Sequence, residues 1–214
     1  VKFLHESGGQ SWSYFRHELE RLREVSEHPG VVTLIDADLS ATPAYFVMPW
    51  LGRGSLANLE QRAALSQVLD WFAQMASALQ FTHEKGILHC DLKPSNVFLV
   101  DGKLEQPKIL DFGIAYYSDA TRVTASGTVV GTPSYMAPEQ ARSGGKVDAT
   151  ADVFSLGCLL FECLTGEPPF IAEHIVAVLA KVVFEDAPRA SEFAPDVPVW
   201  LDRLVERMLA KDPA

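Results

Sequence analysis

The chain has 214 residues, of which 48% are hydrophobic and 21% charged, and its formal net charge at pH 7 is −10. This composition predicts a globular domain with a substantial core and excludes a disordered chain. The acidic balance argues against a nucleic-acid partner, because such partners are bound through basic side chains. Three cysteines (Cys90, Cys158 and Cys163) are too few for a secreted disulfide framework, so the expected compartment is the cytoplasm.

No stretch of these residues is expected to contact or cross a membrane. The longest apolar run, around residues 156–164, is far shorter than the roughly 20 residues of a transmembrane helix, and Glu162 interrupts it. A span beyond residue 214 that tethers a longer protein stays open.

The first 48 residues predict a small sheet with one helix. Residues 1–4 are typical of the end of a strand, and residues 31–35 and 44–48 are β-type runs. Between them, apolar residues recur at three- or four-residue steps, as on one face of an amphipathic helix: Trp12, Phe15, Leu19, Leu22 and Val25. Ser11 or Ser13 is the expected N-cap, and the turn at residues 28–30 is the expected end.

The remainder of the chain is predicted to be mainly helical. A stripe of apolar residues between 65 and 79 indicates a long helix that runs up to Gly86. Residues 153–164 are apolar nearly all round, which indicates a buried central helix that Asp152 begins and Gly166 ends. Two further helices are expected at about 173–184 and 199–210, the second with these residues facing inward: Trp200, Leu201, Leu204, Val205, Met208 and Leu209.

Three polar residues around a predicted hairpin have the chemistry that phosphoryl transfer needs. Asp91 and Asn96 lie on one short loop, and two strands at 97–100 and 107–110, with a turn at Asp101-Gly102, bring Asp111 back beside Asn96. One carboxylate can orient an attacking hydroxyl, while the other carboxylate and the amide can bind Mg²⁺ against a triphosphate.

The segments HCDLKPSN (residues 89–96), DFG (111–113) and APE (137–139) together resemble the protein kinase family, with Cys90 in place of the usual arginine. The resemblance implies an α+β, two-lobed fold. Residues 1–48 then form a partial N-terminal lobe, 49–55 the hinge and 56–214 the C-terminal lobe. Within that lobe, 89–96 is the catalytic loop and 111–139 the activation segment.

The resemblance also implies roles for the polar residues of the site. Asp91 is the expected catalytic base, Lys93 the contact to the transferred phosphate, and Asn96 and Asp111 the ligands of Mg²⁺ or Mn²⁺. Lys2 is expected to bind the α- and β-phosphates of ATP and to form an ion pair with a glutamate of the first helix. Glu18 is favoured for that pair, with Glu20 as the alternative.

In the same resemblance, adenine binds at the hinge. Met48 lies at the back of its pocket, the carbonyl of Pro49 accepts a hydrogen bond from adenine, and the amide of Leu51 donates one. Proline at position 49 removes only a donor that this scheme does not use. Phe98 is the expected floor under the ring, and it also reads as an ordinary core aromatic.

The implied activity is that of an ATP-dependent serine/threonine protein kinase of bacterial type acting on protein substrates. DLKP at 91–94 and Gly131-Thr132 favour the serine/threonine branch, and Gln140 after APE is typical of bacterial members. Dimerisation for autophosphorylation is a further expectation. Two alternatives stay open: a catalytically silent kinase-like binding module and a small-molecule phosphotransferase.

The chain departs from the family pattern in two respects. No glycine-rich loop precedes Lys2, and we therefore expect the 214 residues to be a fragment truncated at both ends, with little activity of its own. Cys90 cannot pair with a phosphate on the activation segment, so Thr124, Ser126 and Thr128 are expected to accept phosphate without acting as a switch. Cys90 itself is either a small filler residue or a redox-sensing thiol.

Overall fold

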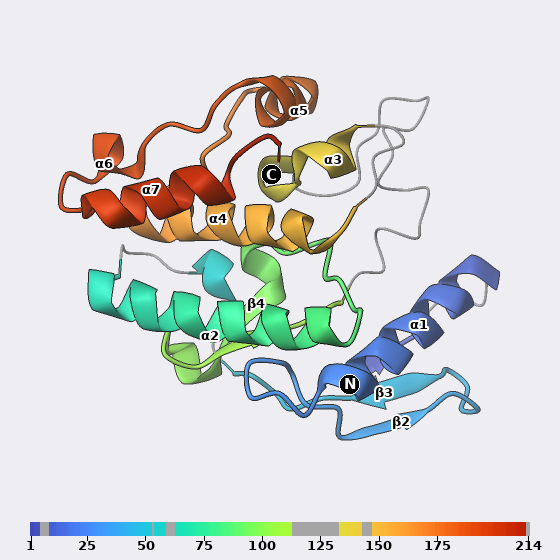
Figure 1. Ribbon diagram of the computed structural model, residues 1–214. Helices are drawn as coiled ribbons and strands as arrows, with labels where there is room; N and C mark the ends of the chain where they lie inside the picture. Colours follow the sequence, from blue (N-terminus) through green and yellow to red (C-terminus); the bar gives the residue numbers. More distant parts are fainter. Residues whose placement is uncertain (5–8, 53, 59–62, 113–132, 143–146, 213–214) are drawn as a thin grey trace.

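The computed structural model describes residues 1–4, 9–52, 54–58, 63–112, 133–142 and 147–212. One part of the molecule is a small antiparallel sheet in the order β1-β3-β2, formed by β1 (Lys2–Phe3), β2 (Asp36–Asp38) and β3 (Tyr45–Val47). The helix α1 (Gly9–Val25) lies against this sheet, and the other part is mainly helical (Figure 1). This is the α+β arrangement that the sequence predicts.

The apolar face of α1 attaches the helix to the sheet. Leu19, Leu22 and Val25 are buried, and the ring of Phe15 packs on Phe46 of β3 with centroids 5.1 Å apart. The helix begins at Gly9, so Ser11 and Ser13 lie inside it and the expected N-cap is wrong.

The strand predicted at residues 31–35 is wrong. Val31 and Val32 are buried and dock on the other sheet: Val32 N donates to the carbonyl of Ile109 at 3.1 Å, and Ile109 N donates to the carbonyl of Gly30 at 2.9 Å. Strand pairing starts only where Ile35 N meets the carbonyl of Val47 at 2.8 Å, and β2 follows. Val31 and Val32 therefore pack in the core beside the second sheet, whereas Ile35 is exposed.

The helical part is built around α2 (Leu65–Glu84) and α4 (Ala149–Thr165), which lie side by side (Figure 1). Shorter helices pack on α4 or on one another, and the structure also contains single 3₁₀ turns. These are α3 (Pro138–Ala141), α5 (Ile175–Phe184), α6 (Ala190–Phe193), α7 (Val199–Met208), η1 (Leu56–Asn58), η2 (Pro94–Asn96), η3 (Val100–Gly102) and η5 (Pro133–Tyr135). Helix α6 was not predicted. Trp200 is 55% exposed, so its predicted inward orientation is wrong.

Helix α4 is the buried centre of this part. Asp148 caps its start by accepting a hydrogen bond from Thr150 N at 2.9 Å, and Gly166 ends it in the left-handed conformation with φ of 92°. The helix thus begins earlier than predicted, and Asp152 lies in its first turn. At Gly157 a Cβ atom would approach Met208 Cβ to 2.9 Å, so glycine permits the close contact with α7.

A hairpin of β4 (Val97–Leu99) and β5 (Pro107–Ile109) positions the polar loop. The predicted turn at Asp101-Gly102 lies in η3, and beyond the strands Val100 N donates to the carbonyl of Gln106 at 3.1 Å. At the other end, Leu110 N donates to the carbonyl of Asn96 at 2.9 Å. That bond places Asp111 next to Asn96, as the sequence predicts.

Among the described residues, no helix is long and apolar enough to span a membrane.

Candidate active site

Three predicted site residues meet on the loop between α2 and β4. The amide nitrogen of Asn96 donates to the backbone carbonyl of Asp91 at 2.8 Å and to its Oδ2 at 3.1 Å. Lys93 Nζ lies 2.7 Å from the same Oδ2. These contacts fix the Asp91 carboxylate between an amide and a cation. Because the nitrogen of Asn96 faces Asp91, its Oδ1 is left for another partner.

Lys2, Glu18 and Asp111 form a second cluster from three separate elements. Lys2 Nζ is hydrogen-bonded to Glu18 Oε1 and lies 2.9 Å from Asp111 Oδ1. The expected contact between Lys2 and the helix glutamate is therefore present, and Glu18 makes it. Glu20 is exposed and faces Arg16 and His17 instead.

The charges of this cluster are set by burial and by the shared lysine. Burial raises the pKa of Glu18 to about 7, although Lys2 opposes the shift. Burial alone would lower the pKa of Lys2 and raise that of Asp111, but the attraction between the ammonium and the carboxylates outweighs it in both cases. Lys2 thus stays a cation and Asp111 an anion. The Asp111 side chain is 44% exposed, so it remains open to a ligand.

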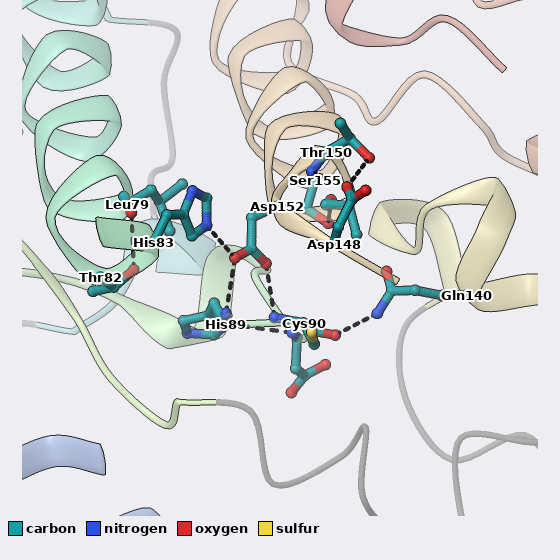
Figure 2. Close-up of polar contacts among 12 residues, drawn as sticks. Leu79, Thr82, His83, His89, Cys90, Gln140, Asp148, Thr150, Asp152 and Ser155 are labelled. Carbon is teal, nitrogen blue, oxygen red and sulfur yellow. Dashed lines mark hydrogen bonds and ion pairs between the residues drawn. The ribbon is translucent and has the colours of Figure 1, made fainter. Parts of the chain in front are cut away.

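Asp152 on α4 holds the backbone that carries Asp91. Its carboxylate accepts hydrogen bonds from the amides of His89 at 2.8 Å and Cys90 at 2.7 Å, and it contacts His83 Nε2 at 2.7 Å (Figure 2). Burial would raise the pKa of this carboxyl group, but these hydrogen bonds, led by the one from His83, lower it instead. Asp152 thus ties the backbone of residues 89 and 90 to α4, and His83 of α2 contacts the same carboxylate.

His89 joins the catalytic loop to the strand that leads to Asp111. Its Nδ1 accepts from the amide of Asp91 at 3.2 Å, and its Nε2 lies 2.9 Å from the carbonyl of Leu110. A neutral ring with hydrogen on Nε2 satisfies both contacts. The ring also packs on Phe112, with centroids 5.1 Å apart. His89 therefore orients the catalytic loop relative to the strand that leads to Asp111.

Cys90 has the properties of a packing residue. Its side chain is 8% exposed, its backbone has φ of 59°, and burial raises the pKa of the thiol to about 12. A redox-sensing thiol requires a lowered pKa and access to solvent. Both observations oppose the redox alternative and favour the filler interpretation.

The hinge residues lie at the junction between the sheet and the helical part. Met48 and Leu51 are partly buried and pack on the core, whereas Pro49 is exposed. Phe98 on β4 is partly buried and bridges to Ser55, and Leu99 N donates to the carbonyl of Gly54 at 3.2 Å. These contacts bring Phe98, the expected floor residue, to the chain that follows the predicted hinge.

The donor set fits a magnesium ion that also binds a substrate. Within the described ranges, no group of three or more His, Cys, Asp and Glu side chains is arranged to hold a metal on its own. Mg²⁺ is usually held by one or two carboxylates together with phosphate oxygens and water. The Asp111 carboxylate and the Asn96 Oδ1 match that requirement.

Most of the predicted activation segment, residues 113–132, lies outside the described residues, and this includes Thr124, Ser126 and Thr128. Its described end is tied to α4: Ser155 Oγ donates to the carbonyl of Tyr135 at 2.7 Å, and Tyr135 Oη donates to Glu162 at 2.9 Å. The sequence did not single out these residues. The only available signal was a serine and a glutamate on an otherwise apolar helix.

The chain belongs to the protein kinase domain family, whose sequence pattern matches residues 1–214. It is 39% identical to the serine/threonine-protein kinase PknB of Mycobacterium leprae over 93% of its own length and 33% of that protein. It is also 39% identical to the DNA damage-responsive serine/threonine-protein kinase RqkA of Deinococcus radiodurans, over 99% of the chain and 32% of that protein. Pkn1 of Myxococcus xanthus is 38% identical over 92% of the chain and 29% of its own length.

The chain thus spans about a third of the length of the curated relatives it matches. Proteins of the family generally use ATP and Mg²⁺, and the relatives named here are bacterial serine/threonine kinases.

Proposed function

We propose that the protein containing this chain transfers the γ-phosphate of ATP to serine or threonine hydroxyls of protein substrates. The observation that carries the proposal is the convergence of Asp91, Asn96 and Asp111, with Lys2 and Glu18 arriving from the sheet and α1. Such a set can orient a hydroxyl, hold a metal and neutralise phosphate charge within one site. The names of the relatives support serine and threonine as the accepting residues.

In this proposal Asp91 positions the substrate hydroxyl and accepts its proton as the oxygen attacks phosphorus. Its carboxylate is held by Asn96 and Lys93, so little reorganisation is needed when the substrate arrives. Lys93 then balances negative charge on the transferred phosphoryl group. A base fixed in this way loses less entropy on reaching the reactive geometry than a freely rotating carboxylate does.

Lys2, Asn96 and Asp111 bind the triphosphate end of ATP, Lys2 directly and the other two through Mg²⁺ or Mn²⁺. The metal, when bound, neutralises charge on the β- and γ-phosphates. Glu18 keeps the ammonium of Lys2 pointed at this place. The hinge supplies the adenine contacts, with the carbonyl of Pro49 as acceptor, the amide of Leu51 as donor, and Met48 and Phe98 against the ring.

The test is transfer of labelled phosphate from ATP to a generic acceptor protein by the purified full-length protein, followed by identification of the labelled amino acid. We expect phosphoserine and phosphothreonine, and loss of both in Lys2→Met. Lys85→Met is the matched control, since Lys85 pairs with Glu27 on the surface at 3.0 Å. ATP binding without transfer would favour the silent binding module, and phosphate found only on small molecules would favour the small-molecule phosphotransferase. The dependence of autophosphorylation on protein concentration tests dimerisation.

A further inference from the structure

Gln140 connects the end of the activation segment to the catalytic loop. Its Oε1 accepts a hydrogen bond from Ala137 N at 3.0 Å. Its Nε2 donates to the backbone carbonyl of Cys90 at 2.8 Å (Figure 2). The two partners fix the orientation of the amide, because a backbone N–H needs the oxygen and a carbonyl needs the nitrogen. The side chain therefore spans two segments 50 residues apart in the sequence.

Helix α4 holds each of these segments separately. Asp152 binds the amides of His89 and Cys90, and Ser155 binds the carbonyl of Tyr135. The bond from Gln140 to Cys90 joins the two segments directly. The catalytic loop, the end of the activation segment and α4 are therefore each hydrogen-bonded to the other two. A shift of one segment then has to move the other.

The carbonyl that Gln140 binds belongs to a strained residue. Cys90 has φ of 59°, a left-handed conformation that is unfavourable for a non-glycine residue and persists only where neighbours hold it. Asp152 holds the amide of Cys90, and Gln140 holds its carbonyl. That carbonyl is part of the peptide group that leads into Asp91. Without the bond from Gln140, this peptide group loses one of its two anchors next to Asp91.

We propose that Gln140 is a positioning residue for Asp91, acting through the carbonyl of Cys90. The inference rests on the proposed phosphotransfer function and gives it a means of alignment. The link uses an uncharged side-chain amide and a backbone carbonyl, so it works without phosphate on the activation segment and without an arginine at position 90.

Two substitutions separate the link from ordinary helix capping. Gln140→Glu keeps an oxygen for Ala137 N but replaces the donor to Cys90 with a second oxygen, whereas Gln140→Met removes both contacts at similar size. Gln67 provides the matched control. It accepts from Ala64 N at 3.3 Å at the start of α2, and its nitrogen contacts only the exposed Glu105 at 2.8 Å. The same two substitutions at Gln67 alter a helix cap away from the site.

In full-length protein we expect both Gln140 variants to lower kcat about tenfold, the rate equivalent of one lost hydrogen bond, with KM for ATP unchanged within about twofold. The Gln67 variants keep the wild-type kcat. A fall in kcat for Gln140→Met alone would reduce Gln140 to a capping residue and overturn the inference. An equal rise in KM for ATP in both variants would do the same, since misalignment of Asp91 acts on the chemical step.

A second measurement does not depend on activity. Cys90 is buried beneath the link, and Cys158 is fully buried in α4. We expect iodoacetamide to alkylate Cys90 at least about fivefold faster in Gln140→Glu than in wild type. The rate at Cys158 should be unchanged, because the substitution makes only the chain around Cys90 open more readily. An unchanged Cys90 rate overturns the inference. Wild-type protein without phosphotransfer overturns the proposed function instead, and the alkylation rates still decide the link.

Discussion

Lys2 Nζ lies 2.9 Å from Asp111 Oδ1, although 109 positions separate the two residues in the sequence. The contact joins the edge of the sheet to the end of the β4–β5 hairpin, and the same ammonium binds Glu18 on α1. One cation thereby sets the spacing of three elements around the place where phosphate is to bind. The alignment of the sheet relative to the catalytic loop follows from charge as well as from apolar packing.

Substitution of Glu18 tests this arrangement. Glu18→Gln keeps the shape of a nearly fully buried side chain but cannot ionise, so Asp111 is the one carboxylate left beside the ammonium of Lys2 in this cluster. We expect kcat/KM for ATP to fall at least about tenfold, which corresponds to about 1.4 kcal/mol of transition-state stabilisation. Glu20→Gln, at the exposed alternative position, is the control. Equal activity of the two variants, or a loss only in Glu20→Gln, would contradict the assignment of Glu18 as the functional partner of Lys2.

Asp111 is expected to act through the metal. Asp111→Asn removes the anionic ligand, so phosphotransfer falls at standard Mg²⁺ and recovers in part when Mn²⁺ is raised, because more metal offsets a weaker site. Steady-state rates over a series of Mn²⁺ concentrations give the measurement. The same series with Asp91→Asn shows no recovery. Parallel responses of the two variants would contradict separate roles for the two aspartates.

The Asp152 network makes a prediction about stability and pH. Removal of the carboxylate in Asp152→Ala leaves the buried amides of His89 and Cys90 without their acceptor, which costs about 3 kcal/mol of unfolding free energy at pH 7. Because the native pKa of Asp152 is lowered, its contribution is complete above the unfolded pKa of about 3.9 and is lost as the pH falls through the native pKa.

Urea unfolding from pH 7 to pH 3 measures this effect. The difference in unfolding free energy between wild type and Asp152→Ala should stay constant down to about pH 4 and narrow only below it. Asp70→Ala on the exposed face of α2 serves as the control and should show no such difference. A difference that grows as the pH falls would mean that the carboxyl group is not stabilised in its ionised form.

Activity is expected to be largely independent of phosphate on the activation segment, because Cys90 provides no cation to bind it. The ammonium of Lys108 already donates to the carbonyl of Pro29. The full-length triple variant with alanine at 124, 126 and 128 should keep its initial rate within about tenfold, or 1.4 kcal/mol in barrier. A larger loss would mean that another basic residue of the chain binds the phosphate.

The sequence predicted the elements that are determined by patterns of residues close together in the chain. The spacing of apolar residues indicated α2, α4 and α7, and the polar loop followed by a hairpin brought Asp91, Asn96 and Asp111 together. Residues 31–35 were misassigned, because β-branched residues indicate an extended, buried segment without saying what it pairs with. The short α6 carries too little periodicity to be detected.

Contacts between distant backbone groups were beyond sequence reasoning. Gln140 was noted only as a residue typical of bacterial kinases, since its partner is a carbonyl that no side-chain pattern reveals. The left-handed conformation of Cys90 was equally hidden, because cysteine carries no preference for it. In contrast, the choice of Glu18 over Glu20 came from the family resemblance, and the contact with Lys2 agrees with it.

The phosphotransfer rate of full-length Asp91→Asn protein tests the account most directly. Asp101→Asn, in the exposed turn after β4 where asparagine tolerates the positive φ, is the matched control. With ATP and Mg²⁺ at saturation, we expect the rate of Asp91→Asn to be lower than wild type by a factor of about 10² to 10⁴, the usual contribution of a general base. Asp101→Asn should match wild type. Phosphotransfer by folded Asp91→Asn at the wild-type rate would contradict the assignment of Asp91 as the base and, with it, the proposed mechanism.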